Sequence, residues 1–307
     1  MDGTVERRAS DTERAARRGV DHVWQADTML TVPARLLGDA ERDVVERLLD
    51  EEPFAAAQVA ERVEAAGVSW WRQDARIFGY GTRRRIESLC WAGANVVPVR
   101  ATPPAIEAFA GMLASEARMC SSLVGTADSV LDLWARLQPA WGTARDVRPE
   151  QPLLMTDTLG PARADPQVRL VRPDEIDLLY PASVAMYTEE VGVSPVAGGD
   201  DGSYRERIAD LIRSGRAYAR IANGRVIFKA ELAIVTRHTA QVQGVWTAPE
   251  LRGHGLATGG MAAVVRDALR RVAPTVSLYV NSYNEPARAM YAKCGFWQVG
   301  TFATVLF

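Results

Sequence analysis

Helical and strand-like patterns of apolar residues alternate along most of the chain. In residues 39–50, Val44, Val45, Leu48 and Leu49 recur at the spacing of a helix. The same patterns predict further helices over residues 54–66, 102–117, 128–137, 174–191, 204–214, 255–272 and 284–293, several of them bounded by Pro or Gly. They predict strands over residues 76–80, 86–91, 95–100, 118–124, 151–156, 168–171, 217–221, 225–236, 239–246, 275–280 and 296–307.

The two halves of this pattern follow the same order of elements, which indicates an internal structural duplication; two unrelated α+β domains are the alternative. Between the halves, residues 158–167 contain one Gly and two Pro and show no periodicity, as in a linker. We therefore expect a flexible tail (1–19), an N-terminal domain (20–158), a linker (159–167) and a second domain (168–307). Each domain is expected to be a mixed, mostly antiparallel sheet flanked by helices, which gives the chain an α+β fold.

Composition and charge exclude several classes of protein. The 307 residues are 48% hydrophobic and 24% charged, which is typical of globular domains, and the length suits two of them. No apolar run approaches the length of a membrane-spanning helix and no secretory segment is visible, so we expect a cytoplasmic protein without a membrane partner. The formal net charge of −2 gives no sign of a basic surface for nucleic acid. With three histidines and three widely spaced cysteines, no metal site is predicted.

The segment over residues 243–266 carries the strongest chemical signal. It predicts a strand, a short turn with Pro249, a glycine-rich loop from Arg252 to Ala257, and a helix. The first N–H groups of a helix lack intrahelical partners and lie at its positive dipole end, so they bind phosphate groups. Glycines let the backbone approach such a ligand closely, and Arg252 adds a charge-assisted contact. The segment matches neither the P-loop nor the dinucleotide-binding pattern; an ordinary glycine-rich helix start is the alternative.

Two motifs in this order resemble the GNAT (GCN5-related) N-acetyltransferase superfamily. Arg252, Gly255 and Ala257 fit its pattern Arg/Gln-x-x-Gly-x-Gly/Ala. Residues 284–296 fit its second cofactor segment, Asn-x-x-Ala-x-x-x-Tyr-x-x-x-Gly-Phe. The resemblance covers about residues 168–307, and the whole chain also resembles bacterial two-domain members, so tandem GNAT-like domains are expected.

The resemblance implies that the protein binds acetyl-CoA as a co-substrate and needs no metal. The pyrophosphate is expected on the amides of residues 253–258. The pantetheine arm is expected along the preceding strand, where the N–H of Val245 polarises the acetyl carbonyl. The implied cofactor-binding residues are Val245, Trp246, Thr247, Arg252, Gly253, His254, Gly255, Leu256, Ala257, Thr258 and Asn284.

The resemblance also implies transfer of the acetyl group to a primary amine by direct attack in a ternary complex. Tyr291 stands where many members have a tyrosine that protonates the departing thiolate; a core aromatic beside Phe296 is the alternative. Many members carry a carboxylate in the middle of the cofactor strand, where this chain has Gln241 and Gln243. Neither amide can act as a base, so no base is predicted on that strand.

Other carboxylates are candidates for contact with the amine. Glu231 lies between apolar residues of the neighbouring strand and is a candidate catalytic residue, with an ion pair to Lys229 as the alternative. Glu189 and Glu190 end a predicted helix in the region that lines the acceptor site in the family, so they are candidates for binding the cationic amine. A solvated helix end is the alternative for these two residues.

The N-terminal half lacks the phosphate-binding motif. At the matching place it has Ala101-Thr102-Pro103-Pro104, and proline has no N–H to donate. We interpret this half as a degenerate GNAT-like domain that shapes the acceptor cleft of the second domain. Two other functions remain open: a non-catalytic acyl-CoA-binding regulatory protein, and a Fem-like transferase that uses aminoacyl-tRNA.

Overall fold

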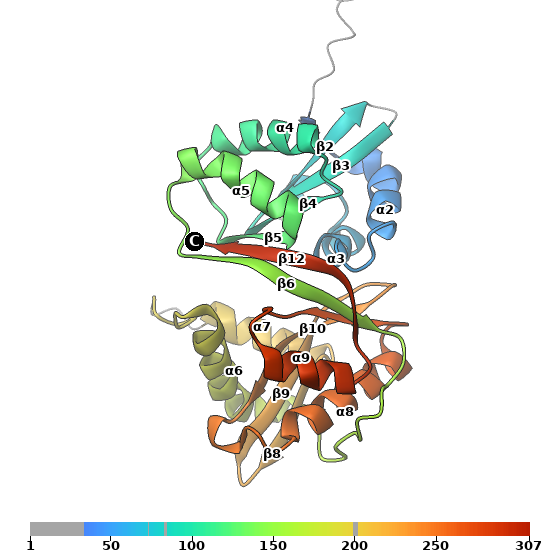
Figure 1. The fold of residues 1–307 in the computed structure, drawn as a ribbon, viewed down its shortest axis with the longest axis vertical. Helices are drawn as coiled ribbons and strands as arrows, with labels where there is room; N and C mark the ends of the chain where they lie inside the picture. Colours follow the sequence, from blue (N-terminus) through green and yellow to red (C-terminus); the bar gives the residue numbers. More distant parts are fainter. Residues whose placement is uncertain (1–33, 73, 83–84, 199–201) are drawn as a thin grey trace, which may run out of the picture.

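A single sheet runs through the described part of the chain. The computed structural model describes residues 34–72, 74–82, 85–198 and 202–307, so the predicted tail and the first residues of the predicted N-terminal domain lie outside it. The described strands form a 12-stranded sheet in the order β1-β2-β3-β4-β5-β12-β6-β11-β10-β9-β8-β7 (Figure 1). Helices cover both faces, which confirms the α+β fold with a mixed sheet.

Each helix and strand expected within the described residues is present, with ends that differ by a few residues. The strands are β1 (Ala34–Leu36), β2 (Arg76–Thr82), β3 (Arg85–Ala92), β4 (Asn95–Val99), β5 (Ser122–Thr126), β6 (Asp146–Thr156), β7 (Arg169–Leu170), β8 (Ala217–Ala222), β9 (Arg225–Val235), β10 (Ala240–Thr247), β11 (Val276–Tyr279) and β12 (Trp297–Leu306). The α-helices are α2 (Arg42–Asp50), α3 (Ala57–Ala66), α4 (Pro103–Ala114), α5 (Ala127–Trp141), α6 (Ile176–Val191), α7 (Gly202–Arg213), α8 (Leu256–Arg271) and α9 (Glu285–Lys293). Short 3-10 helices are η1 (Asp39–Glu41), η2 (Trp70–Arg72), η3 (Pro173–Glu175) and η4 (Pro249–Leu251).

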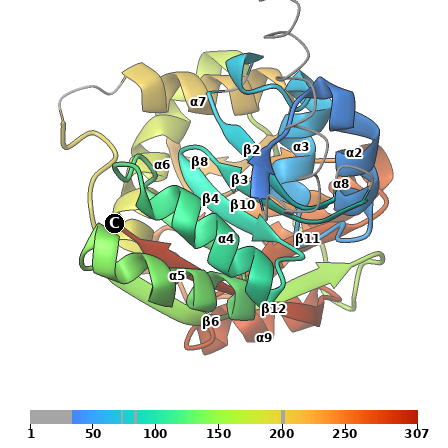
Figure 2. The same cartoon turned by 90° about the horizontal axis from the view of Figure 1, so that it is seen from above.

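Two helical layers cover the part of the sheet formed by β1–β5. Helices α4 and α5 pack on one face, and α2 and α3 pack on the other (Figure 2). Successive strand residues point to opposite faces, so Val96 of β4 lies in the core beneath α4 and α5, whereas Val97 lies with α2 and α3. Burial on both faces explains why these strands are nearly continuous apolar runs in the sequence.

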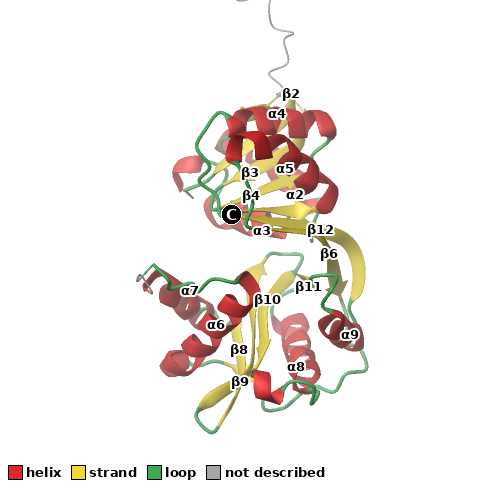
Figure 3. Cartoon of the chain, turned by 60° about the vertical axis from the view of Figure 1, so that its left-hand side comes forward, coloured by secondary structure: helices red, strands yellow, loops and turns green. Residues whose placement is uncertain are grey.

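The strands β8–β11 are covered in the same way, with α8 and α9 on one face and α6 and α7 on the other (Figure 3). Tyr218 of β8 lies in the core beneath α8, and its neighbours Ala217 and Ala219 lie with α6 and α7. Gly260 brings α8 close to β9, because a Cβ at this position would lie 2.6 Å from the ring of Phe228. This contact fixes the helix whose first turn carries the glycine motif.

Both halves repeat one feature of the sheet. Strands β4 and β5 run parallel on either side of α4 in the sequence, and they pair over only two residues of each strand, starting at Asn95. Strands β10 and β11 run parallel on either side of α8, and they also pair over only two residues, starting at Ala240. In each half the two strands therefore separate toward their carboxyl ends. The shared topology supports the predicted duplication.

Strands β6 and β12 join the two halves. β6 pairs with β11 from Leu153 to Thr156 and with β12 over most of its length. The other edge of β12 pairs with β5 from Phe302 to Leu306, although the sequence places residues 296–307 in the second domain. The predicted linker, residues 159–167, has no helix or strand. Because strands from both sides of the linker interleave, the sheet does not divide there, and the predicted domain boundaries stay a prediction.

Polar contacts support this junction. Oε1 of Glu61 in α3 accepts hydrogen bonds from the Arg216 side chain (2.7 Å) and from the Val235 backbone N–H (2.9 Å). The side chain of Gln151 in β6 accepts a hydrogen bond from Thr304 Oγ1 (2.6 Å) and donates one to Asn281 Oδ1 (2.8 Å). The α2–α3 layer and β6 are thereby fixed against the second half of the molecule.

Glycine replacements in α8 and α4 test the close approach of α8 to the sheet. In Gly260→Ala the new Cβ meets the ring of Phe228, so we expect overpacking to destabilise the protein by about 1–3 kcal/mol. In Gly111→Ala the new Cβ meets nothing within 4 Å, so we expect helix propensity alone to stabilise it by about 0.5–1 kcal/mol. Urea unfolding measures how each replacement changes the free energy of unfolding. A change in the same direction in both variants would contradict this packing.

Candidate active site

Strand β10, which precedes the glycine-rich loop, contains a β-bulge. The register with β9 shifts between Gln243 and Trp246. As a result, Gly244 and Val245 together face a single residue of β9. Gly244 has a φ of +58°, a left-handed conformation that glycine adopts without strain. The backbone leaves the regular ladder at this point, beside the Val245 N–H that the sequence assigns to the acetyl carbonyl.

A glycine-rich loop links β10 to α8. Helix α8 begins at Leu256, with Gly255 as its N-cap. Gly253 and Gly255 have φ values of +79° and +77°, and a Cβ at either position would meet nothing within 4 Å. The loop backbone is therefore accessible on that side, as anion binding at a helix start requires. Of the predicted cofactor residues in this region, Arg252, Gly253, His254 and Gly255 are exposed, Val245, Trp246, Leu256, Ala257 and Thr258 are half-buried, and Thr247 is buried.

An ion pair joins Arg252, which the sequence assigns to the cofactor, to Glu189, which it assigns to the acceptor amine. Both terminal nitrogens of Arg252 donate to the carboxylate oxygens of Glu189, each at 2.7 Å, and Arg252 Nε donates to Thr247 O at 3.0 Å. The Arg252 guanidinium lowers the pKa of Glu189, and the Glu189 carboxylate raises the pKa of Arg252. The pair links the C-terminal end of α6 to the end of β10. Both side chains remain about half exposed, so a ligand can still reach them.

Strand β9 carries a buried ion pair next to the bulge. Lys229 Nζ donates to Glu231 Oε2 at 3.1 Å, and Arg207 Nη2 of α7 donates to Glu231 Oε1 at 3.0 Å. Burial acts to raise the pKa of Glu231, but Lys229 and Arg207 outweigh it and hold the pKa below its usual value. A Cβ on Gly244 would lie 3.0 Å from Lys229 Nζ, so this glycine leaves the space that the pair fills. The geometry favours the ion-pair alternative for Glu231, and its catalytic role stays a prediction.

Helix α9 positions the two polar residues of the second motif. Asn284 is the N-cap, and its side-chain oxygen accepts a hydrogen bond from the Ala287 N–H at 3.2 Å. Tyr291 is buried, and its ring packs edge-on against Phe296 with centroids 5.7 Å apart. Burial, with the Glu190 charge in addition, raises the pKa of Tyr291, so the phenol keeps its proton at neutral pH. Tyr291 thus combines the packing of a core aromatic with the protonation state of an acid.

Glu190 reaches solvent, yet protein surrounds it on several sides. Its backbone oxygen accepts a hydrogen bond from Arg148 Nη2 of β6 at 2.7 Å. Incomplete hydration raises the pKa of its carboxyl group; Arg148 and Lys229 act in the opposite direction, and Glu231 adds to the rise. Among the predicted acceptor-binding residues, Glu190 is therefore the one whose carboxylate lies among the ionisable groups of the site.

Two residues near Glu190 are not expected from the sequence. Burial and the Glu190 charge raise the pKa of Tyr279, at the end of β11, to about 12. Arg148 belongs to the segment assigned to the N-terminal domain, and only the pairing of β6 with β11 and β12 brings it here. No local pattern in the sequence signals either residue, because both depend on strand pairing across the two halves.

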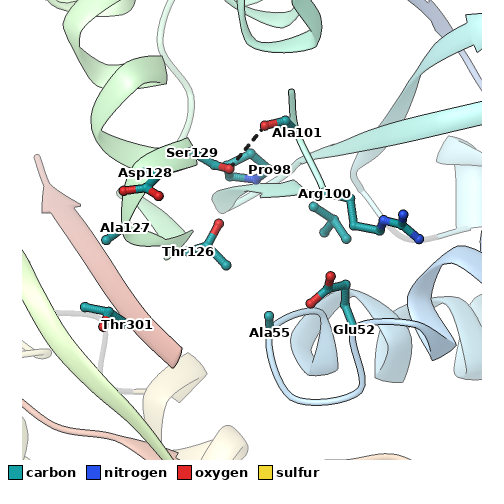
Figure 4. A pocket seen from close by; sticks show the side chains of 11 residues that line it. Glu52, Ala55, Pro98, Arg100, Ala101, Thr126, Ala127, Asp128, Ser129 and Thr301 are labelled. Atoms are coloured by element: carbon teal, nitrogen blue, oxygen red, sulfur yellow. Dashed lines mark hydrogen bonds between the residues drawn. The ribbon is translucent and has the colours of Figure 1, made fainter. Parts of the chain in front are cut away.

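The corresponding place in the N-terminal half contains a cavity of about 560 Å³ (Figure 4). It lies where β4 and β5 separate, and the side chains of Glu52 and Asp128 approach it from opposite sides. Helix α4 begins there with Pro103 and Pro104, which have no N–H to donate. This half thus keeps the strand geometry of the second half without a phosphate-binding helix start.

Two kinds of feature are absent from the residues that the structure describes. No group of three or more His, Cys, Asp or Glu side chains is placed there to hold a metal ion. No helix in the same part of the chain is long and apolar enough to cross a bilayer.

Comparison with solved structures identifies the fold. A GNAT acetyltransferase from Colwellia psychrerythraea aligns with a TM-score of 0.52 at 12% identity, covering 89% of this chain and 99% of that one. A tandem GNAT protein from the clavulanic acid biosynthesis pathway aligns with a TM-score of 0.51 at 16% identity, covering 88% and 97%. A Drosophila protein aligns with a TM-score of 0.62 at 12% identity, covering 90% and 98%. These likenesses show that the chain has a tandem GNAT fold.

The family assignment follows from sequence models. Residues 184–296 match the model described as the acetyltransferase (GNAT) family, and residues 75–179 match one described as a domain of unknown function, DUF4081. Residues 184–296 thus match a GNAT acetyltransferase domain, and a DUF4081 domain precedes them. A comparison with curated proteins gives no match.

Replacement of Lys229 tests the structural role of the buried ion pair. In Lys229→Met, Glu231 stays buried and loses one of its two cationic partners, so we expect a loss of stability of about 3–5 kcal/mol. In the double variant Lys229→Met with Glu231→Leu no unpaired buried carboxylate remains, so we expect most of that loss to be recovered. Urea unfolding measures both values; a single variant as stable as the double one would contradict a structural pair.

Proposed function

We propose that the protein is an acetyl-CoA-dependent N-acetyltransferase that moves the acetyl group to a primary amine by direct attack in a ternary complex. One observation carries this proposal. Residues 243–256 contain three features in succession. They are a β-bulge in β10, the end of β10 where β11 no longer pairs with it, and the start of α8, where glycines leave the backbone accessible. The match to a GNAT acetyltransferase domain supports acyl transfer as the reaction class.

The donor is held by backbone groups. The pyrophosphate binds the amides at the start of α8, where the dipole is positive and side chains do not obstruct the approach. The pantetheine arm lies beside β10 beyond Gln241, where β11 no longer pairs with it, and hydrogen-bonds to the strand around Val245 and Thr247 in the manner of an added strand. Because Arg252 already has Glu189 as a partner, its main contribution is to hold the loop against β10.

The chemistry of transfer follows from the same strand. The Val245 N–H donates to the thioester carbonyl oxygen and stabilises the negative charge that develops there when the amine attacks. Tyr291, which like any tyrosine holds its proton at neutral pH, supplies that proton to the departing thiolate. The attacking amine must be neutral, and at pH 7 deprotonation of a lysine-type amine costs roughly 4–5 kcal/mol. A base at the acceptor end therefore increases the rate.

Calorimetry with coenzyme A tests the donor site. In Gly255→Val the β-branched side chain strains the left-handed N-cap and covers the amides, so we expect coenzyme A to bind about 10-fold more weakly or worse, a change of roughly 1.4 kcal/mol. Gly142→Val is the matched control, since Gly142 has a φ of +83° and equal free space but lies in the N-terminal half. Equal affinity of Gly255→Val and the wild type would contradict the proposed site.

Release of free thiol from acetyl-CoA, measured with a panel of small and peptide amines, tests the activity. We expect transfer to at least one primary amine, with release that depends on the amine. A non-catalytic acyl-CoA-binding protein is the second candidate, because the cofactor strand carries Gln241 and Gln243, which hydrogen-bond to each other at 3.2 Å, in place of a carboxylate. Binding of coenzyme A without transfer to any amine would favour that candidate.

A further inference from the structure

We propose that Glu190 is the general base that takes a proton from the acceptor amine. This assignment deepens the proposed function and rests on it. Glu190 is the next-to-last residue of α6, which packs against β9 and β10. The pair of Glu189 with Arg252 holds this end of α6 at the end of β10, and Arg148 holds the Glu190 backbone from β6. Glu190 is thereby fixed beside the strand that polarises the acetyl carbonyl.

The ionised groups around Glu190 come from three neighbouring elements. Arg148 of β6 and Lys229 of β9 are its cationic neighbours, and Glu231 of β9 is an anionic one. Arg207 of α7 reaches the same group of charges through its ion pair with Glu231. Lys229 and Arg207 pair with Glu231, and Arg148 pairs with Asp146, so none of these three cations forms an ion pair with the Glu190 carboxylate.

Uncharged groups complete the surroundings. Tyr279 of β11 and Tyr291 of α9 both lie within the electrostatic influence of Glu190, which raises the pKa of each. Strand β10, which also packs against α6, presents the neutral Gln241 and Gln243. Helices α6 and α9 cover opposite faces of the sheet, and the charge of Glu190 still acts on the phenol expected to protonate the leaving thiolate.

The other two candidate carboxylates, those of Glu231 and Glu189, already have cationic partners. Both oxygens of Glu231 are in ion pairs, one buried with Lys229 and one with the half-exposed Arg207. Both oxygens of Glu189 accept hydrogen bonds from Arg252. The carboxylate of Glu190 makes no hydrogen bond or ion pair with the residues that the structure describes, and it reaches solvent. Incomplete hydration raises its pKa, which makes the carboxylate a stronger base toward the amine.

The proton balance of the reaction is complete with these groups. Glu190 takes one N–H proton from the ammonium form of the acceptor, and the freed lone pair forms the C–N bond to the acetyl carbon. The C–S bond breaks, and the sulfur leaves as a thiol with the proton of Tyr291. The remaining excess N–H proton restores Tyr291, and Glu190 returns its proton to solvent. One proton is released for each amide formed.

The pH dependence of kcat/KM in Glu190→Gln tests the assignment. With the best alkyl amine of the panel, we expect a loss of about 10²–10⁴-fold, and we expect the rise of activity through the pKa of Glu190 to disappear. Hydroxylamine, an acceptor that is already neutral at pH 7, is expected to show a much smaller loss. Glu190→Asp, which keeps a carboxylate, is expected to keep the rise with pH.

Glu189→Gln is the matched control at the adjacent position. Removal of this charge loosens Arg252 and is expected to raise the KM for acetyl-CoA, while the rise of activity with pH remains. Calorimetry with coenzyme A is expected to give wild-type affinity for Glu190→Gln, which shows that the donor site is intact. An equal loss with the alkyl amine and with hydroxylamine, or an unchanged pH profile, would overturn the role of Glu190 alone. A wild-type protein that transfers to no amine would overturn the proposed function and this role with it.

Discussion

The departure of β10 from the regular ladder is the constraint on which the site depends. It requires a residue that adopts a left-handed conformation and leaves space toward β9, and Gly244 meets both requirements. The space is filled by Lys229 and Glu231, whose burial is costly unless each charge is satisfied. Arg207 supplies the second cation for the carboxylate. The distorted strand is therefore stabilised from the adjacent strand by charge as well as by its own backbone.

The two halves of the molecule build the site together. Glu189 and Glu190 are neighbours in α6, but one is held by Arg252 of the glycine loop and the other by Arg148 of β6. The second contact exists only because β6 crosses from the N-terminal half to pair with β11. The N-terminal half, which has prolines in place of a phosphate-binding loop, thus acts as a wall of the site.

Local patterns in the sequence predict most of the secondary structure and the donor end of the site. Helical and strand periodicity, with Pro and Gly at the ends, located each predicted helix and strand to within a few positions, but it gave no sign of the short strand β1. The glycine motif predicted the start of α8, because positive φ values and an unobstructed helix end are local properties. The pairing of Arg252 with Glu189 and the place of Arg148 were not predictable in this way. They depend on which strands lie side by side, and β12 pairs with β5 although more than half the length of the chain separates them.

The position of β12 also determines the order in which the protein can form. During synthesis, β5 leaves the ribosome early, but the strand that covers its free edge is made after every other described strand. Until then that edge exposes unpaired backbone groups, which invite incorrect pairing with other chains. Domains usually fold as soon as they are synthesised, whereas here the half made first waits for the half made second. The sheet of the first half is therefore complete only after β12 of the second half has paired with β5, and neither half is a finished unit without the other.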